Sequence, residues 1–324
     1  MPNARLKGSK GMDELARYRN LVFDSARWAD FSFRRGDIVV STPPKCGTTW
    51  MQTLCAMVVL DAVEFDRPLA QISPWLDMLT NDLGAVVRDL ETQEHRRIIK
   101  THTPLDGLPY DERVLYVCVG RDPRDVALSF EHHLANLDMD AFMAARAAAV
   151  GLDDLAELGP APDPPPTDAE ERFWEWANAD PGAGSSMGPT LTEILHHLRT
   201  FWDQRASQNI ALFHYGDLLT DLPGELRRLS DVLEITVTDE RLADYTAAGT
   251  FESMKRRADD LVPDVGNRIW HSNRDFFHRG REGEGRDLLS DDALRRYQER
   301  VAELVAPDLD TWAHSGWHGS DPPA

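Results

Sequence analysis

Asp37-Ile-Val-Val-Ser-Thr-Pro-Pro-Lys-Cys-Gly-Thr-Thr-Trp50 is the stretch that decides the fold of this chain. Its β-branched beginning favours a buried strand, and Pro43 and Pro44 end any strand ladder. Gly47 allows a tight turn after that strand. The largely apolar residues 51–60 then predict a helix that is buried against a sheet.

A strand followed by a tight loop and a helix start is suited to holding an anion. The helix start supplies N–H donors and partial positive charge, Thr48 and Thr49 can cap it, and Lys45 adds a full charge. The loop differs from the standard nucleoside-triphosphate loop, because Lys45 precedes Gly47 and no Gly-Lys-Ser/Thr occurs in the chain. Taken alone, the stretch also fits an ordinary strand-turn-helix of a doubly wound fold.

Composition narrows the classes of function. The chain has 324 residues, enough for one or two domains, and its net charge of −20 argues against non-specific nucleic-acid binding. The three cysteines, Cys46, Cys55 and Cys118, favour free thiols in a reducing compartment. No apolar stretch is long enough to span a membrane, and residues 1–10 lack the apolar core of a secretory signal. The sequence therefore predicts a cytoplasmic enzyme.

Two more apolar runs end in residues suited to phosphate or proton chemistry. Residues 97–104 and 113–120 predict short strands, the second with the two-sided apolar character of a central parallel strand. Ligands collect at the carboxyl ends of such strands, where Lys100, His102 and Arg121 are expected. A lone histidine there is more often structural, but the Lys45 loop makes a catalytic role the better hypothesis.

The remaining pattern predicts an α/β fold with a central, mostly parallel sheet flanked by helices. Arg121 leads into a helix that starts near Pro123 and carries Ser129 two turns later, and a guanidinium with a hydroxyl suits a phosphate dianion. The other elements that we expect are helices over 11–30, 141–151, 191–205 and 223–233, a strand over 210–217, and a loop followed by a short helix over 72–79.

These motifs resemble the cytosolic-type sulfotransferases. The first loop is similar to their 5′-phosphosulfate loop, Pro-Lys-Ser-Gly-Thr-Thr-Trp, with Cys46 in the place of Ser. Lys100-Thr-His102 resembles the segment with the family's catalytic base, and Arg121 with Ser129 resembles its 3′-phosphate segment. The resemblance runs in order over about residues 31–289, so the chain is identified as a bacterial member of the family.

Later segments extend this resemblance to the nucleotide. Tyr215 matches a tyrosine that touches it, and Phe251 matches the aromatic residue that sandwiches the adenine opposite Trp50. His278 stands where the family has Arg, and Gly285, where it usually has Trp, is expected to loosen the loop. The implied nucleotide-binding residues are Lys45, Cys46, Gly47, Thr48, Thr49, Trp50, Arg121, Ser129, Tyr215, Phe251, His278, Arg279 and Gly280.

The resemblance implies sulfuryl transfer from 3′-phosphoadenosine 5′-phosphosulfate (PAPS), with 3′,5′-ADP (PAP) as product, to a hydroxyl or amine of a small molecule. His102 would take the acceptor proton, Lys45 and Lys100 would stabilise the leaving phosphate, and no metal is required. A phenol, steroid-like or lipid alcohol is favoured as acceptor, with Trp75 and Phe130 in the pocket wall. Two alternatives stay open: a kinase with a modified phosphate loop, and a catalytically silent PAP-binding module.

We expect one sulfotransferase domain over residues 1–324 that contains a mobile insert at about 138–189. Proline and glycine at 160–166 and 182–186 indicate loops. Residues 286–295 do not keep the dimer motif of many animal members, and a homodimer stays possible. Aromatic residues in the insert either cover the acceptor as a lid or pin the insert to the body: Phe173, Trp174 and Trp176.

Overall fold

A single parallel sheet lies at the centre of the chain. The computed structural model describes residues 15–158, 165–180, 188–263 and 265–317. The strands stand in the order β2-β1-β3-β4: β1 (Ile38–Ser41), β2 (Ile98–Thr101), β3 (Leu115–Gly120) and β4 (Ile210–His214). Ile38 pairs with Ile98 on one side and with Leu115 on the other. The predicted α/β class with a parallel central sheet is confirmed.

Helices connect the strands and cover the sheet. The longer ones are α1 (Thr48–Leu60), α3 (Leu83–Thr92), α4 (Pro123–Ala135), α5 (Met139–Val150), α6 (Ala169–Asn178), α7 (Leu191–Trp202), α9 (Leu222–Val232), α10 (Asp239–Gly249), α15 (Asp291–Leu304) and α16 (Pro307–Ser315). The shorter ones are α2 (Leu69–Ile72), α8 (Tyr215–Thr220), α11 (Phe251–Arg256), α12 (Ala258–Leu261), α13 (Asn273–Phe276), α14 (Glu284–Asp287), η2 (Ser25–Asp30), η3 (Leu105–Gly107), η4 (Asp153–Leu158) and η5 (Val265–Asn267).

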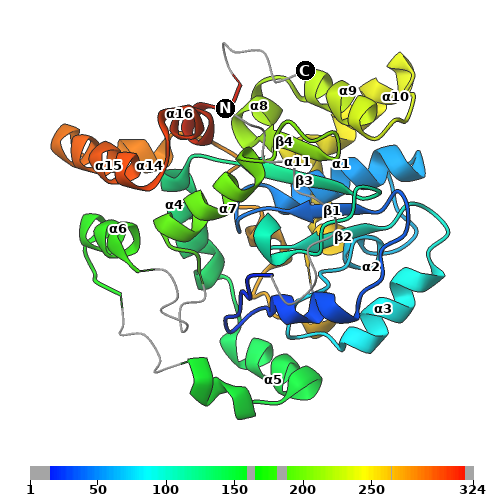
Figure 1. Ribbon diagram of the computed structural model, residues 1–324, viewed down its shortest axis with the longest axis horizontal. Helices are drawn as coiled ribbons and strands as arrows, with labels where there is room; N and C mark the ends of the chain where they lie inside the picture. The colour runs from blue at the N-terminus through cyan, green and yellow to red at the C-terminus, as the bar shows by residue number, and fades with distance from the viewer. Residues whose placement is uncertain (1–14, 159–164, 181–187, 264, 318–324) are drawn as a thin grey trace.

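Alternate strand residues build a core on each face of the sheet. Val39 and Cys118 belong to the cluster that includes α7, α15 and α16, whereas Val40 and Val117 belong to the one that includes α1, α9 and α10. Every residue of the strands is buried, as expected for a parallel sheet covered on both faces. Figure 1 shows these two helical layers, with α5 apart from the sheet.

The strand order fixes where a ligand can bind. The chain leaves β1 through α1 and returns to β2 on one side of β1, while β3 lies on the other side. This reversal opens a crevice at the carboxyl ends of β1 and β3, which is the usual ligand position in open α/β sheets. The loop after β1 carries Lys45, and Arg121 directly follows β3.

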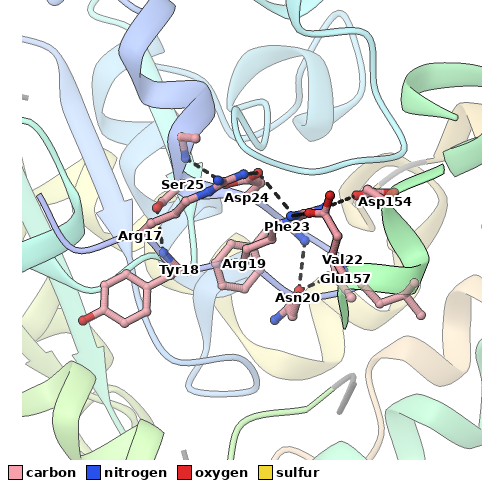
Figure 2. Close-up of polar contacts among 12 residues, drawn as sticks. Arg17, Tyr18, Arg19, Asn20, Val22, Phe23, Asp24, Ser25, Asp154 and Glu157 are labelled. Carbon is pink, nitrogen blue, oxygen red and sulfur yellow. Dashed lines mark hydrogen bonds and ion pairs between the residues drawn. The ribbon is translucent and has the colours of Figure 1, made fainter. Parts of the chain in front are cut away.

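The prediction of a helix over residues 11–30 is wrong for most of the residues that the structure describes there. Only η2 is helical there, and Figure 2 shows the stretch before it. The Asn20 side-chain oxygen accepts hydrogen bonds from the backbone N–H groups of Val22 and Phe23, at 2.8 and 3.0 Å. Such local side-chain bonds compete with helical ones, so the segment turns instead. Residues 11–14 lie outside the described residues.

The short helix predicted after Pro74 is also absent. Trp75 instead forms a parallel bridge with Lys100, beside the outer strand β2. The Lys100 N–H donates to the Pro74 carbonyl at 2.9 Å, and the Leu76 N–H donates to the Lys100 carbonyl at 3.2 Å. The open edge of β2 offers these partners, which sequence periodicity does not reveal.

The aromatic residues of the insert pack onto the body. Phe173 is buried in the cluster with α7 and α15, and its ring centroid lies 5.8 Å from that of Tyr297. The Trp176 indole N–H donates to the Pro189 carbonyl at 2.8 Å. Most of the 160–166 run and all of 182–186 lie outside the described residues. In the described part of the chain, no helix is long and apolar enough to cross a membrane.

Candidate functional site

A cavity of about 860 Å³ opens at the carboxyl ends of β1, β2 and β3, and we call it the central cavity. Its size falls in the range of about 300–1,000 Å³ that is typical of small-molecule sites. It brings together all but one of the predicted site residues: Lys45, Gly47, Thr48, Thr49, Trp50, Lys100, His102, Arg121, Ser129, Tyr215, Phe251, His278, Arg279 and Gly280. Trp75 and Phe130, the expected pocket walls, line it as well.

The loop after β1 has a constrained backbone. Lys45 and Gly47 both adopt left-handed conformations, with φ of 67° and 95°. A side chain at Gly47 would also approach the Tyr215 ring, since a Cβ at this position would lie 3.0 Å from the nearest ring carbon. The Thr48 hydroxyl meets the Thr42 hydroxyl at 2.6 Å, which ties the start of α1 to the end of β1. The loop is therefore preorganised with its N–H groups at a helix start.

Lys45 brings positive charge into the wall of the central cavity. Its ammonium lies 3.3 Å from Nδ1 of His133 and 4.5 Å from the centroid of the Phe276 ring. Loss of water around Lys45, followed by repulsion from Arg121 and Lys100, lowers its pKa to about 7. A bound anion would relieve that repulsion and restore the full charge of the lysine.

His102 is arranged to accept a proton. Its Nδ1 lies 2.7 Å from the Thr42 carbonyl oxygen, and a carbonyl only accepts, so Nδ1 carries the ring hydrogen. The lone pair is then on Nε2. Burial and the charge of Lys100 hold the pKa of His102 well below its usual value, so the ring is neutral. The Trp75 ring packs on it nearly at a right angle, with centroids 4.6 Å apart.

Arg121 joins the first loop to a second one near residue 280. Its guanidinium donates to the Lys45 carbonyl at 3.1 Å and to the Arg281 carbonyl at 2.8 Å. The same group lies 4.3 Å from the Tyr215 ring centroid. Within the described residues, the buried Nε of Arg121 has no hydrogen-bond partner. An unsatisfied buried donor on a cation is well placed for an anionic ligand.

The second loop is held by a carboxylate, and the loosening expected from Gly285 is not found. Asp125 accepts from the backbone N–H groups of Gly283 and Gly285 at 2.8 and 2.7 Å. A Cβ at Gly285 would lie 2.3 Å from the Arg124 carbonyl carbon, so no larger residue fits there without a shift. His278 stacks on His132 with ring centroids 3.7 Å apart.

Cys46 is the predicted site residue that the structure does not bring to the central cavity. Its side chain is fully buried in the same cluster as Cys118, and burial raises the pKa of the thiol to about 12. Its backbone N–H donates to the Pro43 carbonyl at 3.3 Å. The left-handed backbone conformation of Lys45 turns the Cys46 side chain into the core, where a neutral thiol fits. A contact between this side chain and a nucleotide is therefore not supported.

The segment 17–23 lines the central cavity, although its sequence pattern predicts only a helix outside the site. Arg19 fastens it to the insert through ion pairs with Asp154 and Glu157 at 2.7 and 2.6 Å, which Figure 2 shows. The Tyr18 hydroxyl lies 2.8 Å from both Asp106 and His196. No sequence signal points to these contacts, because their partners are far away in the chain.

One group of residues in the wall of the central cavity is apolar. It includes members of a small hydrophobic cluster that packs beneath α5: Met78, Leu137, Phe142 and Ile269. His133 also faces the cavity, although the sequence indicates only a packed or solvated histidine pair there. Over the described ranges, no group of three or more His, Cys, Asp or Glu side chains is arranged to hold a metal ion.

Comparison with known proteins points to one family. The sequence model of the sulfotransferase domain matches residues 35–307. A glycolipid sulfotransferase of Mycobacterium bovis is 42% identical over 319 residues, which cover 94% of this chain and 96% of that protein. A glycolipid sulfotransferase of Mycobacterium tuberculosis is 42% identical over 318 residues, with the same coverage.

Solved structures show the same fold at lower identity. The crystal structure of mouse sulfotransferase SULT7A1 complexed with PAP superposes with a TM-score of 0.63 and 17% identity, covering 92% of this chain and 98% of that one. At this identity the likeness concerns the arrangement of helices and sheet.

The fixed second loop gives a prediction for Gly285→Ala. The added methyl group collides with the backbone of Arg124, so we expect the free energy of unfolding to fall by about 1–3 kcal/mol. Gly266→Ala is the matched control, because a Cβ there meets nothing within 4 Å, and we expect a change within about 0.5 kcal/mol. Chemical denaturation measures both, and a Gly285→Ala variant as stable as the wild type would contradict this packing.

Proposed function

The chain belongs to the sulfotransferase family and is a PAPS-dependent sulfotransferase, and we propose that it sulfates a hydroxyl of an amphipathic lipid such as a glycolipid. The observation that carries the residue assignments is the meeting of Lys45, His102 and Arg121 in one cavity. Lys45 and Arg121 lie on separate loops, which suits a ligand with phosphates at two ends. His102, the proposed proton acceptor, lines the same cavity.

The residues fit the nucleotide on physical grounds. In the proposal, Lys45, Thr48 and Thr49 hold the 5′ end at the start of α1, and Arg121 with Ser129 holds the 3′-phosphate. The unpartnered Nε of Arg121 favours an anion, and a bound anion would relieve the repulsion from Arg121 and Lys100 that helps to lower the pKa of Lys45. The rings of Trp50 and Phe251 line the same cavity, and stacking of a base on such rings is worth about 1–3 kcal/mol.

When bound, PAPS supplies the activated sulfuryl group. His102 then accepts the proton of the acceptor hydroxyl at Nε2, which its Nδ1 contact with Thr42 leaves free. The ammonium groups of Lys45 and Lys100 stabilise the negative charge that grows on the leaving phosphate oxygen. Lys100 is held for this role above the Trp75 ring, 4.1 Å from its centroid.

The lining of the central cavity supports an amphipathic acceptor. Phe142, Met78 and Leu137 offer an apolar wall, whereas Tyr18 and Asn20 border the same cavity with polar groups. An apolar tail and a polar head could each be matched. The names of the mycobacterial relatives point to the same class of acceptor.

The kinase alternative gains no support. Asp122, the one metal-ligand candidate for it in the sequence, is engaged in an ion pair with Arg124 at 2.6 Å and caps α4. A transfer assay with labelled PAPS and a panel of glycolipids, phenols and steroid alcohols tests the proposal against the silent module. We expect label on the glycolipid; label on none of the acceptors would favour the silent module, and label only on a phenol would refute the lipid acceptor.

We expect His102→Ala to lower turnover by at least ~10²-fold, because it removes the proton acceptor. The affinity for PAP, measured by calorimetry, should stay nearly unchanged. His95→Ala is the matched control, since its Nδ1 contacts the neighbouring Arg96 carbonyl and the residue does not line the cavity. Near-normal turnover in His102→Ala would remove this residue from the mechanism.

The lowered pKa of Lys45, about 7, predicts that PAP binding takes up a proton. At pH 8 most of the free protein has a neutral Lys45, and the anion requires the charged form, so affinity falls as the pH rises above 7. Calorimetry in buffers of different ionisation enthalpy should show uptake of nearly one proton at pH 8. Lys45→Arg keeps its charge and should show almost none; equal uptake by both proteins would contradict the assignment.

A further inference from the structure

Asp77 is a fully buried carboxylate beside β2 that no sequence motif singles out. Its Oδ1 accepts a hydrogen bond from the Trp75 indole N–H at 2.7 Å. Its Oδ2 accepts from three donors, namely the Trp28 indole N–H at 3.0 Å and the hydroxyls of Thr101 and Thr103, each at 2.7 Å. All four partners present a hydrogen, which is the environment of an ionised carboxylate.

A buried charge is expensive for a protein to keep. Removing a carboxylate from water costs several kcal/mol unless hydrogen bonds replace its hydration, as the four donors do for Asp77. Burial raises the pKa of Asp77, and the bonds to Thr101, Thr103 and the two indoles oppose that shift. Apolar side chains could fill the same space at lower cost. The groups that these bonds hold in place therefore indicate the role of Asp77.

Three of the four donors border the proposed reaction centre. The Trp75 ring packs against His102, with centroids 4.6 Å apart, and lies under the Lys100 ammonium at 4.1 Å. Thr101 and Thr103 flank His102 in the chain, and the Thr103 N–H donates to the Thr101 hydroxyl at 2.9 Å. One carboxylate therefore holds both the aromatic ring and the backbone turn that orient His102.

We propose that Asp77 is a positioning residue for sulfuryl transfer, which acts by fixing the Trp75 indole and the turn around His102. This inference rests on the proposed role of His102 as the base. A displacement of a reacting group by about 1 Å can cost about 10²-fold in rate. Asp77 contacts neither nucleotide-binding loop in the bonds above, so its effect should fall on turnover rather than on nucleotide affinity.

Asp77→Asn tests this role, because it keeps the size but removes the charge and turns an NH₂ group toward a donor. We expect kcat to fall by about 10-fold or more, while the dissociation constant for PAP changes by less than about 3-fold. Trp28→Phe is the matched control: it removes another donor to Asp77, from a ring packed against Phe31 and Phe33 instead of against His102. Its kcat should stay near that of the wild type.

The proposal is overturned if Asp77→Asn keeps the wild-type kcat, or if Trp28→Phe lowers kcat equally. A parallel loss of kcat and PAP affinity would also overturn it, as a sign of general disruption. If Asp77→Asn does not fold, Thr103→Val removes one donor at constant shape, and an unchanged kcat in that variant counts against the proposal. Normal turnover in His102→Ala would instead refute the base, whatever Asp77→Asn does.

Discussion

The guanidinium of Arg121 is the contact on which the geometry of the site depends. It donates to the carbonyls of Lys45 and Arg281, and so connects the loop after β1 with the loop near residue 280. Both hydrogen-bond partners are backbone carbonyls, so neither of them neutralises the positive charge of Arg121. Lys45 and Lys100 lie near this charge, and burial, followed by repulsion from Arg121 and Lys100, lowers the pKa of Lys45. An anionic ligand would stabilise the whole arrangement.

The sheet explains why these groups meet. β1 lies between β2 and β3, so the residues that follow all three strands share one edge of the sheet. Each strand then contributes a different chemistry there: Lys45 after β1, His102 after β2 and Arg121 after β3. The chain has a net charge of −20, so most of its surface would repel an anionic ligand. The positive charge of the central cavity is therefore a local exception.

Local sequence predicts the sheet and the first loop, because strand ends and helix starts are specified by neighbouring residues. Site residues later in the chain, such as Tyr215 and Phe251, are indicated only by the resemblance to the family. Contacts between distant residues cannot be predicted in this way. Asn20 turns the chain through side-chain bonds where periodicity indicates a helix, and Asp77 gathers donors that come from three separate segments. The direction of Cys46 depends on the left-handed backbone of Lys45, which composition does not encode.

In the proposed function, the cavity recognises a nucleotide with phosphates at both its 3′ and 5′ ends. The most direct measurement is calorimetry of PAP and of AMP, which lacks the 3′-phosphate, with the wild type and with Arg121→Ala. A charge-assisted contact is worth about 1.5–3 kcal/mol, so the wild type should bind PAP at least about 10-fold more tightly than AMP, and Arg121→Ala should lose most of that preference. Equal affinity of the wild type for both nucleotides, or equal weakening of both in the variant, would contradict the account.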